Sequence, residues 1–199
     1  MNRKLGLYSS CIAAICTIVF GVGLTIKFDF LNYFSCMILS WSYVLLTCAY
    51  AFYAKEDRKA VANAGVAIAV IYAVFINLVY FSQLTTVVYK TADEAILDAI
   101  TFRAGSWLFG FDIFGYGIMA LSTFLIGLTI EVKTKKDKWM KVMLLLHGVF
   151  FPACVILPML NIFNAGTEDA SGITALMVWC IYFAPIMILS ALHFKDIEN

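Results

Sequence analysis

The segment GSWLFGFDIFGYGIMALSTFLIGLTI, from Gly105 to Ile130, decides how the rest of the chain is interpreted. It exceeds the length of about 20 apolar residues that a helix needs to cross a hydrocarbon core. Asp112 lies within it and is the only acidic residue in any predicted membrane span of the chain. A carboxylate at membrane depth is costly to desolvate and normally faces a bundle interior or a wet cavity, so Asp112 is the first candidate for a functional residue.

The composition of the 199-residue chain is that of a membrane protein. Hydrophobic residues make up 63% of it and charged residues 14%, whereas about 25% of residues are charged in soluble proteins. A formal net charge of +1 gives no attraction to nucleic acid, so we expect no nucleic-acid partner. All six cysteines lie in apolar segments, without a CxxC pair or a Cys–His cluster. This pattern predicts neither a disulfide framework nor a metal site.

Six segments have the length and apolar character of membrane helices. They predict an all-α integral membrane protein, a bundle of six transmembrane helices that forms a single domain over residues 1–199. The first segment resembles a signal peptide, but no small-residue cleavage site precedes Lys27, so we expect a retained helix. The predicted spans are at about residues 7–26, 31–54, 60–82, 107–129, 139–162 and 172–194.

The distribution of basic residues predicts the orientation of these spans in the cell membrane. With the N-terminus in the cytoplasm, eleven lysines and arginines fall on the cytoplasmic side and three, Lys27, Lys90 and Arg103, fall outside. This strong bias predicts that both termini are cytoplasmic, because cytoplasmic loops carry the excess of positive charge. The eleven are Arg3, Lys4, Lys55, Arg58, Lys59, Lys133, Lys135, Lys136, Lys138, Lys141 and Lys195.

The connection between the third and fourth spans, residues 83–106, contains a second helical signal. The sequence TADE from Thr91 to Glu94 has the spacing of a capping box. Apolar residues then recur at helical spacing, which predicts a short amphipathic surface helix over about residues 92–102. It would serve either as a spacer docked on the lipid interface or as a lid over the mouth of the bundle.

Helical spacing brings further polar residues towards Asp112. Tyr116 lies one turn along the same face of the fourth span. In the third span, Asn77 continues a stripe of small residues and lies at the same depth as Asp112, and Tyr80 follows one turn further out. We therefore expect these groups to meet in the outer half of the bundle. The competing interpretation is structural, since a helix N-terminus favours a negative charge and an asparagine often joins two helices.

The histidines and prolines add weaker signals. His147, in the fifth span, and His193, at the inner end of the sixth, differ in depth, so a bis-histidine haem is not expected. We expect no cofactor. His147 is either a hydrogen-bonded interior residue or a proton relay. Pro152 and Pro185 lie near the middle of their spans and predict kinks around an internal space.

No hydrolase, metalloprotease or nucleotide-binding motif occurs in the sequence, so no catalytic residue is expected. The leading expectation is a small membrane protein that binds or transports a small solute or cation. A proton on Asp112, a homodimer or a partner subunit would supply the motive force. The alternatives are a non-transporting scaffold, sensor or immunity-type interaction protein, and a membrane enzyme acting on lipid. The expected ligand-binding or proton-linked residues are Asp112, Asn77, Tyr116, Tyr80 and His147.

Overall fold

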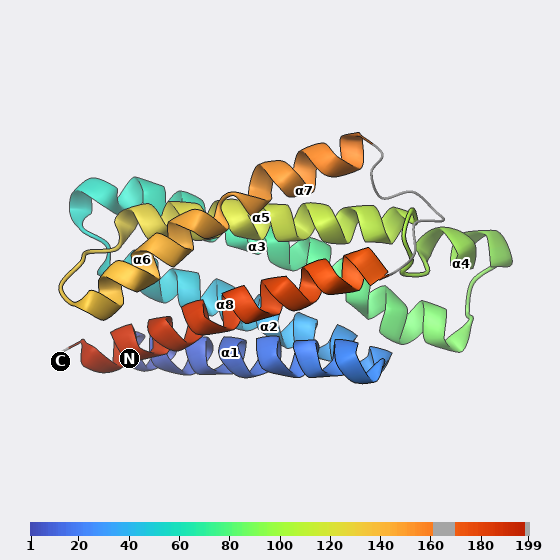
Figure 1. The fold of residues 1–199 in the computed structure, drawn as a ribbon, viewed down its shortest axis with the longest axis horizontal. Coiled ribbons are helices and arrows are strands. Elements are labelled where there is room, and N and C mark those ends of the chain that lie inside the picture. The colour runs from blue at the N-terminus through green and yellow to red at the C-terminus, as the bar shows by residue number, and fades with distance from the viewer. Residues whose placement is uncertain (161–169, 198–199) are drawn as a thin grey trace.

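The computed structural model describes residues 1–160 and 170–197, which form an elongated bundle of helices without a strand in those ranges (Figure 1). Within these ranges, six stretches are helical, long and apolar enough to cross a membrane, which confirms the prediction of an all-helical chain with six such segments for the described residues. Both termini lie at one end of the bundle, called the terminal end below, and α4 lies at the opposite, distal end (Figure 1). The helices are α1 (Asn2–Ile26), α2 (Asp29–Tyr53), α3 (Lys59–Ser82), α4 (Glu94–Ile100), α5 (Trp107–Thr129), α6 (Lys135–His147), α7 (Phe150–Met159) and α8 (Ala170–Asp196).

The first two helices form a tight hairpin with a glycine beside its turn. Lys27 ends α1 in the left-handed conformation, with φ 55°, and its N–H bonds to the carbonyl of Gly23. A Cβ atom at Gly23 would lie 2.0 Å from Oδ1 of Asn32. A larger residue at Gly23 would force the Asn32 side chain to move, whereas the Asn32 backbone nitrogen, 3.5 Å from the same Cβ, lies at ordinary contact distance.

The small residues of α3 face α5, the helix that carries Asp112. Gly65 and Ala69 are buried, and the Ser122 hydroxyl donates to the Gly65 carbonyl at 2.7 Å. A Cβ atom at Gly65 would lie 3.0 Å from Cδ1 of Ile126. The two backbones therefore approach closely, as small residues allow between membrane helices.

The fifth predicted span consists of two helices, α6 and α7, with a break at Gly148 and Val149. Pro152 cannot donate a backbone hydrogen bond, and the preceding turn tightens to i→i+3 bonds such as Val149 N–H to Leu146 O, at 3.0 Å. Beyond the break α7 packs on α5 and has no buried residue. The predicted end of this span, Ile162, lies outside the described residues. Pro185 lies inside α8, which stays helical through it, and the kink expected there remains a prediction.

The connection at the distal end contains the expected helix, but not the expected cap. Helix α4 begins at Glu94 after the N-cap Asp93, and no side chain caps it, so the predicted capping box is wrong. A π-helical turn, Gln83–Val87, extends α3 instead. The Gln83 side chain holds the far end of the connection: it donates to Ile100 O at 2.9 Å and accepts from Phe102 N at 3.0 Å. The buried Gln83 side chain thus holds the backbone of this segment against the bundle through the Ile100 carbonyl and the Phe102 N–H.

Candidate functional site

Asp112 is buried near the distal start of α5. The helix begins behind the N-cap Ser106, whose hydroxyl accepts from Phe109 N at 3.3 Å. The Asp112 side chain is 2% exposed, and its Oδ1 atom has no hydrogen-bond partner. Over the described ranges, no lysine, arginine or histidine forms an ion pair with it. An acidic group buried without a countercharge is costly, because transfer of an isolated carboxylate out of water is strongly unfavourable.

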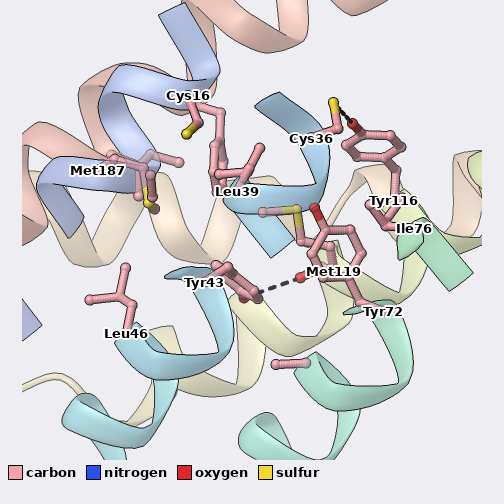
Figure 2. Close-up of a cluster of buried hydrophobic side chains, with 14 of the residues drawn as sticks. Cys16, Cys36, Leu39, Tyr43, Leu46, Tyr72, Ile76, Tyr116, Met119 and Met187 are labelled. Carbon is pink, nitrogen blue, oxygen red and sulfur yellow. Dashed lines mark hydrogen bonds between the residues drawn. The ribbon is translucent and has the colours of Figure 1, made fainter. Parts of the chain in front are cut away.

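Phenol and thiol groups from three helices surround the carboxylate. The Tyr80 side chain, from α3, is close enough to Asp112 for the two groups to interact electrostatically. Tyr80 also interacts with Tyr116 and Cys36, and the Cys36 sulfur lies 3.3 Å from the Tyr116 hydroxyl (Figure 2). We call Asp112, Tyr80, Tyr116, Cys36 and Tyr72 the carboxylate cluster. It offers weak hydrogen-bond donors and no positive charge.

Tyr72 contributes a second unpaired atom to the carboxylate cluster. Its side chain is 0% exposed, and its hydroxyl has no hydrogen-bond partner. Its ring lies 6.0 Å from that of Tyr116, and Asp112 and Cys36 are within electrostatic range. Buried polar atoms without a partner are rare in proteins, and such an atom often marks the place of a water or an ion. Two of them in one cluster indicate binding capacity that the protein itself does not use.

The distal side of this cluster is covered by aromatic rings. Phe102, which follows α4, lies 6.1 Å from Tyr33, 6.0 Å from Tyr80 and 5.6 Å from Phe109, measured between ring centres. Tyr33 stacks on Tyr80 at 5.4 Å. The Gln83 hydrogen bond to the Phe102 backbone holds this cover in place. The site is therefore closed on its distal side.

Of the residues expected at the site, Tyr80 and Tyr116 join Asp112, whereas Asn77 bonds elsewhere. The Asn77 amide donates to Ser40 Oγ at 2.8 Å and to Ala73 O at 2.7 Å. Both of its amide hydrogens are therefore directed to α2 and to its own helix. This arrangement matches the role of an asparagine that joins two helices.

His147 connects to the carboxylate cluster only through another ring. It is 0% exposed, and its Nε2 accepts from Trp179 Nε1 at 3.0 Å. Because a tryptophan N–H can only donate, the histidine proton resides on Nδ1, which has no partner. Trp179 then packs edge-on against Tyr116, at 5.0 Å between ring centres. His147 is thus an interior residue one aromatic contact removed from the site.

A second polar site, at the terminal end, was not expected from the sequence. His193 Nδ1 lies 2.7 Å from Asp137 Oδ1, and Asp137 also closes a capping box with Thr134 at the start of α6. The TKKD spacing signals that cap, but nothing local pairs it with His193, 56 residues later. The pair lines a cavity of about 420 Å³. The other residues lining it are Tyr50, Tyr53, Ala54, Thr129, Ile130, Glu131, Lys133, Thr134, Lys136, Asp196 and Ile197.

Two ion pairs lie at or near this terminal-end cavity. Lys136 binds Asp196 at 2.9 Å, and Lys55 binds Glu131. The hydrogen bond from Lys55 holds the pKa of the Glu131 carboxyl below its usual value. Comparison with protein-family models, with curated proteins and with solved structures finds no match to this chain. A function must therefore be argued from the two sites.

Proposed function

We propose that the protein is a multi-pass protein of the cell membrane that binds a proton or a small monovalent cation at Asp112, as the ion-linked step of small-solute transport. The observation that carries the proposal is the unpaired Oδ1 of Asp112 in a side chain that is 2% exposed. Ionisable groups within membrane helices commonly belong to ion pathways and proton relays.

The charge balance of the carboxylate cluster supports this function. An ionised carboxylate there would lack a basic partner, so a proton or a bound cation has to neutralise it. The hydroxyls of Tyr72 and Tyr80 are further oxygen atoms within electrostatic range of it. Oxygen atoms and aromatic faces are suitable neighbours for a small cation. A scaffold would gain nothing from an unpaired acid in its core.

The distribution of lysine and arginine supports cytoplasmic termini, which put Asp112 in the outer half of the membrane. Cysteine scanning tests this orientation. In intact cells, Ala92→Cys in the distal connection should react with an impermeant maleimide, and Lys135→Cys at the start of α6 should not. The opposite labelling would reverse the orientation and move Asp112 to the inner half.

Infrared spectroscopy of the full chain in lipid nanodiscs tests the function directly. On a pH titration, the wild type should show a carboxylic-acid C=O band that disappears as the Asp112 carboxylate forms. If Na⁺, K⁺ or tetramethylammonium is the ligand, its binding should displace the proton and remove the same band at a lower pH. Asp112→Asn should remove that band. Asp98→Asn, which changes an exposed acid paired with Arg103, should keep it. A spectrum without a titrating or cation-sensitive band would reject ion binding and favour the non-transporting scaffold.

A further inference from the structure

Helix α6 has a buried face and an exposed one. Its buried residues recur at steps of three and four, which places them on one side of the helix, and α6 packs against α5 and α8. They are Asp137, Met140, Leu144 and His147. A second set at the same spacing is exposed on the side away from the bundle. We call this set the α6 outer face: Lys135, Lys138, Trp139, Val142 and Leu146.

The chemistry of the α6 outer face changes in order along the helix. Lys135 and Lys138 lie in the first turn of α6, which begins at the terminal end of the bundle (Figure 1). Trp139 follows, 66% exposed, and then come the exposed aliphatic side chains of Val142 and Leu146. A phospholipid has the same order, with a charged phosphate, a glycerol ester region and a hydrocarbon chain. Tryptophan is enriched at the level of the headgroups.

The two lysines of the α6 outer face differ from other lysines at this end, which are bonded to the protein itself. Those others are Lys55, Lys59, Lys136 and Lys141. The side chains of Lys135 and Lys138 form no hydrogen bond or ion pair with any described residue. The only acid between residues 133 and 141 is Asp137, which is buried and hydrogen-bonded inside the bundle. Two positive charges beside Trp139 therefore have no partner from the protein.

We infer that the α6 outer face binds a phospholipid with an anionic headgroup. The ammonium groups of Lys135 and Lys138 contact the phosphodiester, the Trp139 ring lies at the ester region, and an acyl chain packs along Val142 and Leu146. Charge complementarity selects the anionic class, because a zwitterionic headgroup carries a cation of its own that competes with the lysines. The cytoplasmic leaflet carries the anionic lipids, which agrees with the predicted orientation of this end. This lipid site does not depend on ion binding at Asp112.

The exposed tryptophan at the distal end lacks such charges. Trp107 begins α5 and is 72% exposed, so its exposure is comparable to that of Trp139. The nearest basic residue along the chain, Arg103, pairs with Asp98. Trp107 therefore serves as an internal control, because it offers an exposed indole without unpaired lysines beside it.

Quenching of tryptophan fluorescence by brominated phospholipids tests the site in the full chain. The protein is placed in phosphatidylcholine nanodiscs with a minor fraction of chain-brominated lipid, either phosphatidylglycerol or phosphatidylcholine. Subtracting the spectrum of Trp139→Phe or of Trp107→Phe isolates the emission of each tryptophan. Brominated phosphatidylglycerol should quench Trp139 more strongly than brominated phosphatidylcholine, and added salt should weaken that preference. Trp107 should show no preference.

Lysine variants show which charges produce the preference. The double variant Lys135→Gln, Lys138→Gln should lower the affinity for phosphatidylglycerol relative to phosphatidylcholine about tenfold or more, because each juxtamembrane lysine attracts anionic lipid. Arginine at both positions should keep the preference. The matched control is Lys4→Gln, Lys195→Gln, which removes two exposed lysines from the same end and should also keep it. Either single substitution on α6 serves as a second test if the double variant fails to fold.

Three results would overturn the lipid site. An equal preference at Trp107 would ascribe the effect to an exposed indole. An equal loss in the control variant would ascribe it to the net charge of the terminal end. Competition by soluble glycerol phosphate would mean that a free phosphate, and not a lipid, is the ligand.

Discussion

The buried carboxylates at the two ends of the bundle differ in how many hydrogen-bond partners they have. At the terminal end, Asp137 binds His193 through Oδ1 and accepts from Thr134 and from Lys133 N through Oδ2. At the distal end, Asp112 keeps an unpaired oxygen although it is less exposed, at 2% against 5%. An acid whose oxygens are all hydrogen-bonded contributes to the stability of the fold. An acid with an unpaired oxygen can still bind a proton or a ligand. The two carboxylates should therefore respond differently to removal.

The largest effect is expected for Asp137→Ala, which removes the helix cap and leaves His193 without its partner. We expect a loss of about 3 kcal/mol in the free energy of unfolding, the sum of a cap and charged hydrogen bonds. Reversible unfolding in mixed micelles would measure it. Asp196→Ala is the control, because its exposed pair with Lys136 contributes less than about 1 kcal/mol. If both variants lost the same free energy of unfolding, Asp137 would contribute no more to stability than an exposed acid.

Asp112→Asn should change the free energy of unfolding much less, by about 1 kcal/mol or less in either direction. The amide keeps the shape of the side chain and abolishes the buried charge, and removing poorly compensated buried charge is often neutral or stabilising. Proton or cation binding should disappear in the same variant. A large loss of stability with intact ion binding would show that Asp112 is structural.

A pair of tyrosine variants sharpens the comparison at the level of single hydroxyls. Tyr72→Phe deletes an unpaired hydroxyl and should leave stability unchanged or raise it. Tyr43→Phe deletes a hydroxyl bonded to Thr123 and Ser122 and should cost about 1 kcal/mol. Thermal unfolding of the two variants side by side measures the difference. The reverse order would mean that Tyr72 has a partner within the folded protein.

The smallest effect concerns the exposed pair of Glu131 and Lys55. The pKa of Glu131 in the folded protein lies below its usual value because of the hydrogen bond from Lys55. Its stabilising contribution is therefore present above the ordinary glutamate pKa and is lost as pH falls through the lowered one. The difference in melting temperature between wild type and Glu131→Gln should be small at neutral pH and vanish in acid. If the difference in melting temperature instead grew as the pH fell, the pKa of Glu131 would not be lowered in the folded protein.

The sequence predicted the helices better than it predicted which faces they share. Span ends follow from local hydropathy and charge, so α5 runs from Trp107 to Thr129 as expected. Asn77 shows where such reasoning fails. It continues the stripe that begins at Gly65, but four-residue steps overshoot a turn of 3.6 residues, and three of them rotate the face by about 120°. The face at Gly65 contacts α5, whereas Asn77 contacts Ser40 on α2.

The pairing of His193 with Asp137 could not be predicted for a different reason. Each residue has a clear local role, one near the end of α8 and the other in the cap of α6. Their contact depends on how two helices dock side by side, which neither periodicity nor depth specifies.

The way Gln83 holds the distal connection has a practical consequence for engineering. Its amide binds Ile100 and Phe102, so the chain between them and α3 forms a loop closed at its base. Lys90, at the exposed tip with φ 52°, contributes nothing to that closure. An epitope or a fluorescent reporter inserted beside Lys90 should therefore leave Phe102 seated over Tyr80, because insertion tolerance depends on the burial and bonding of the affected backbone.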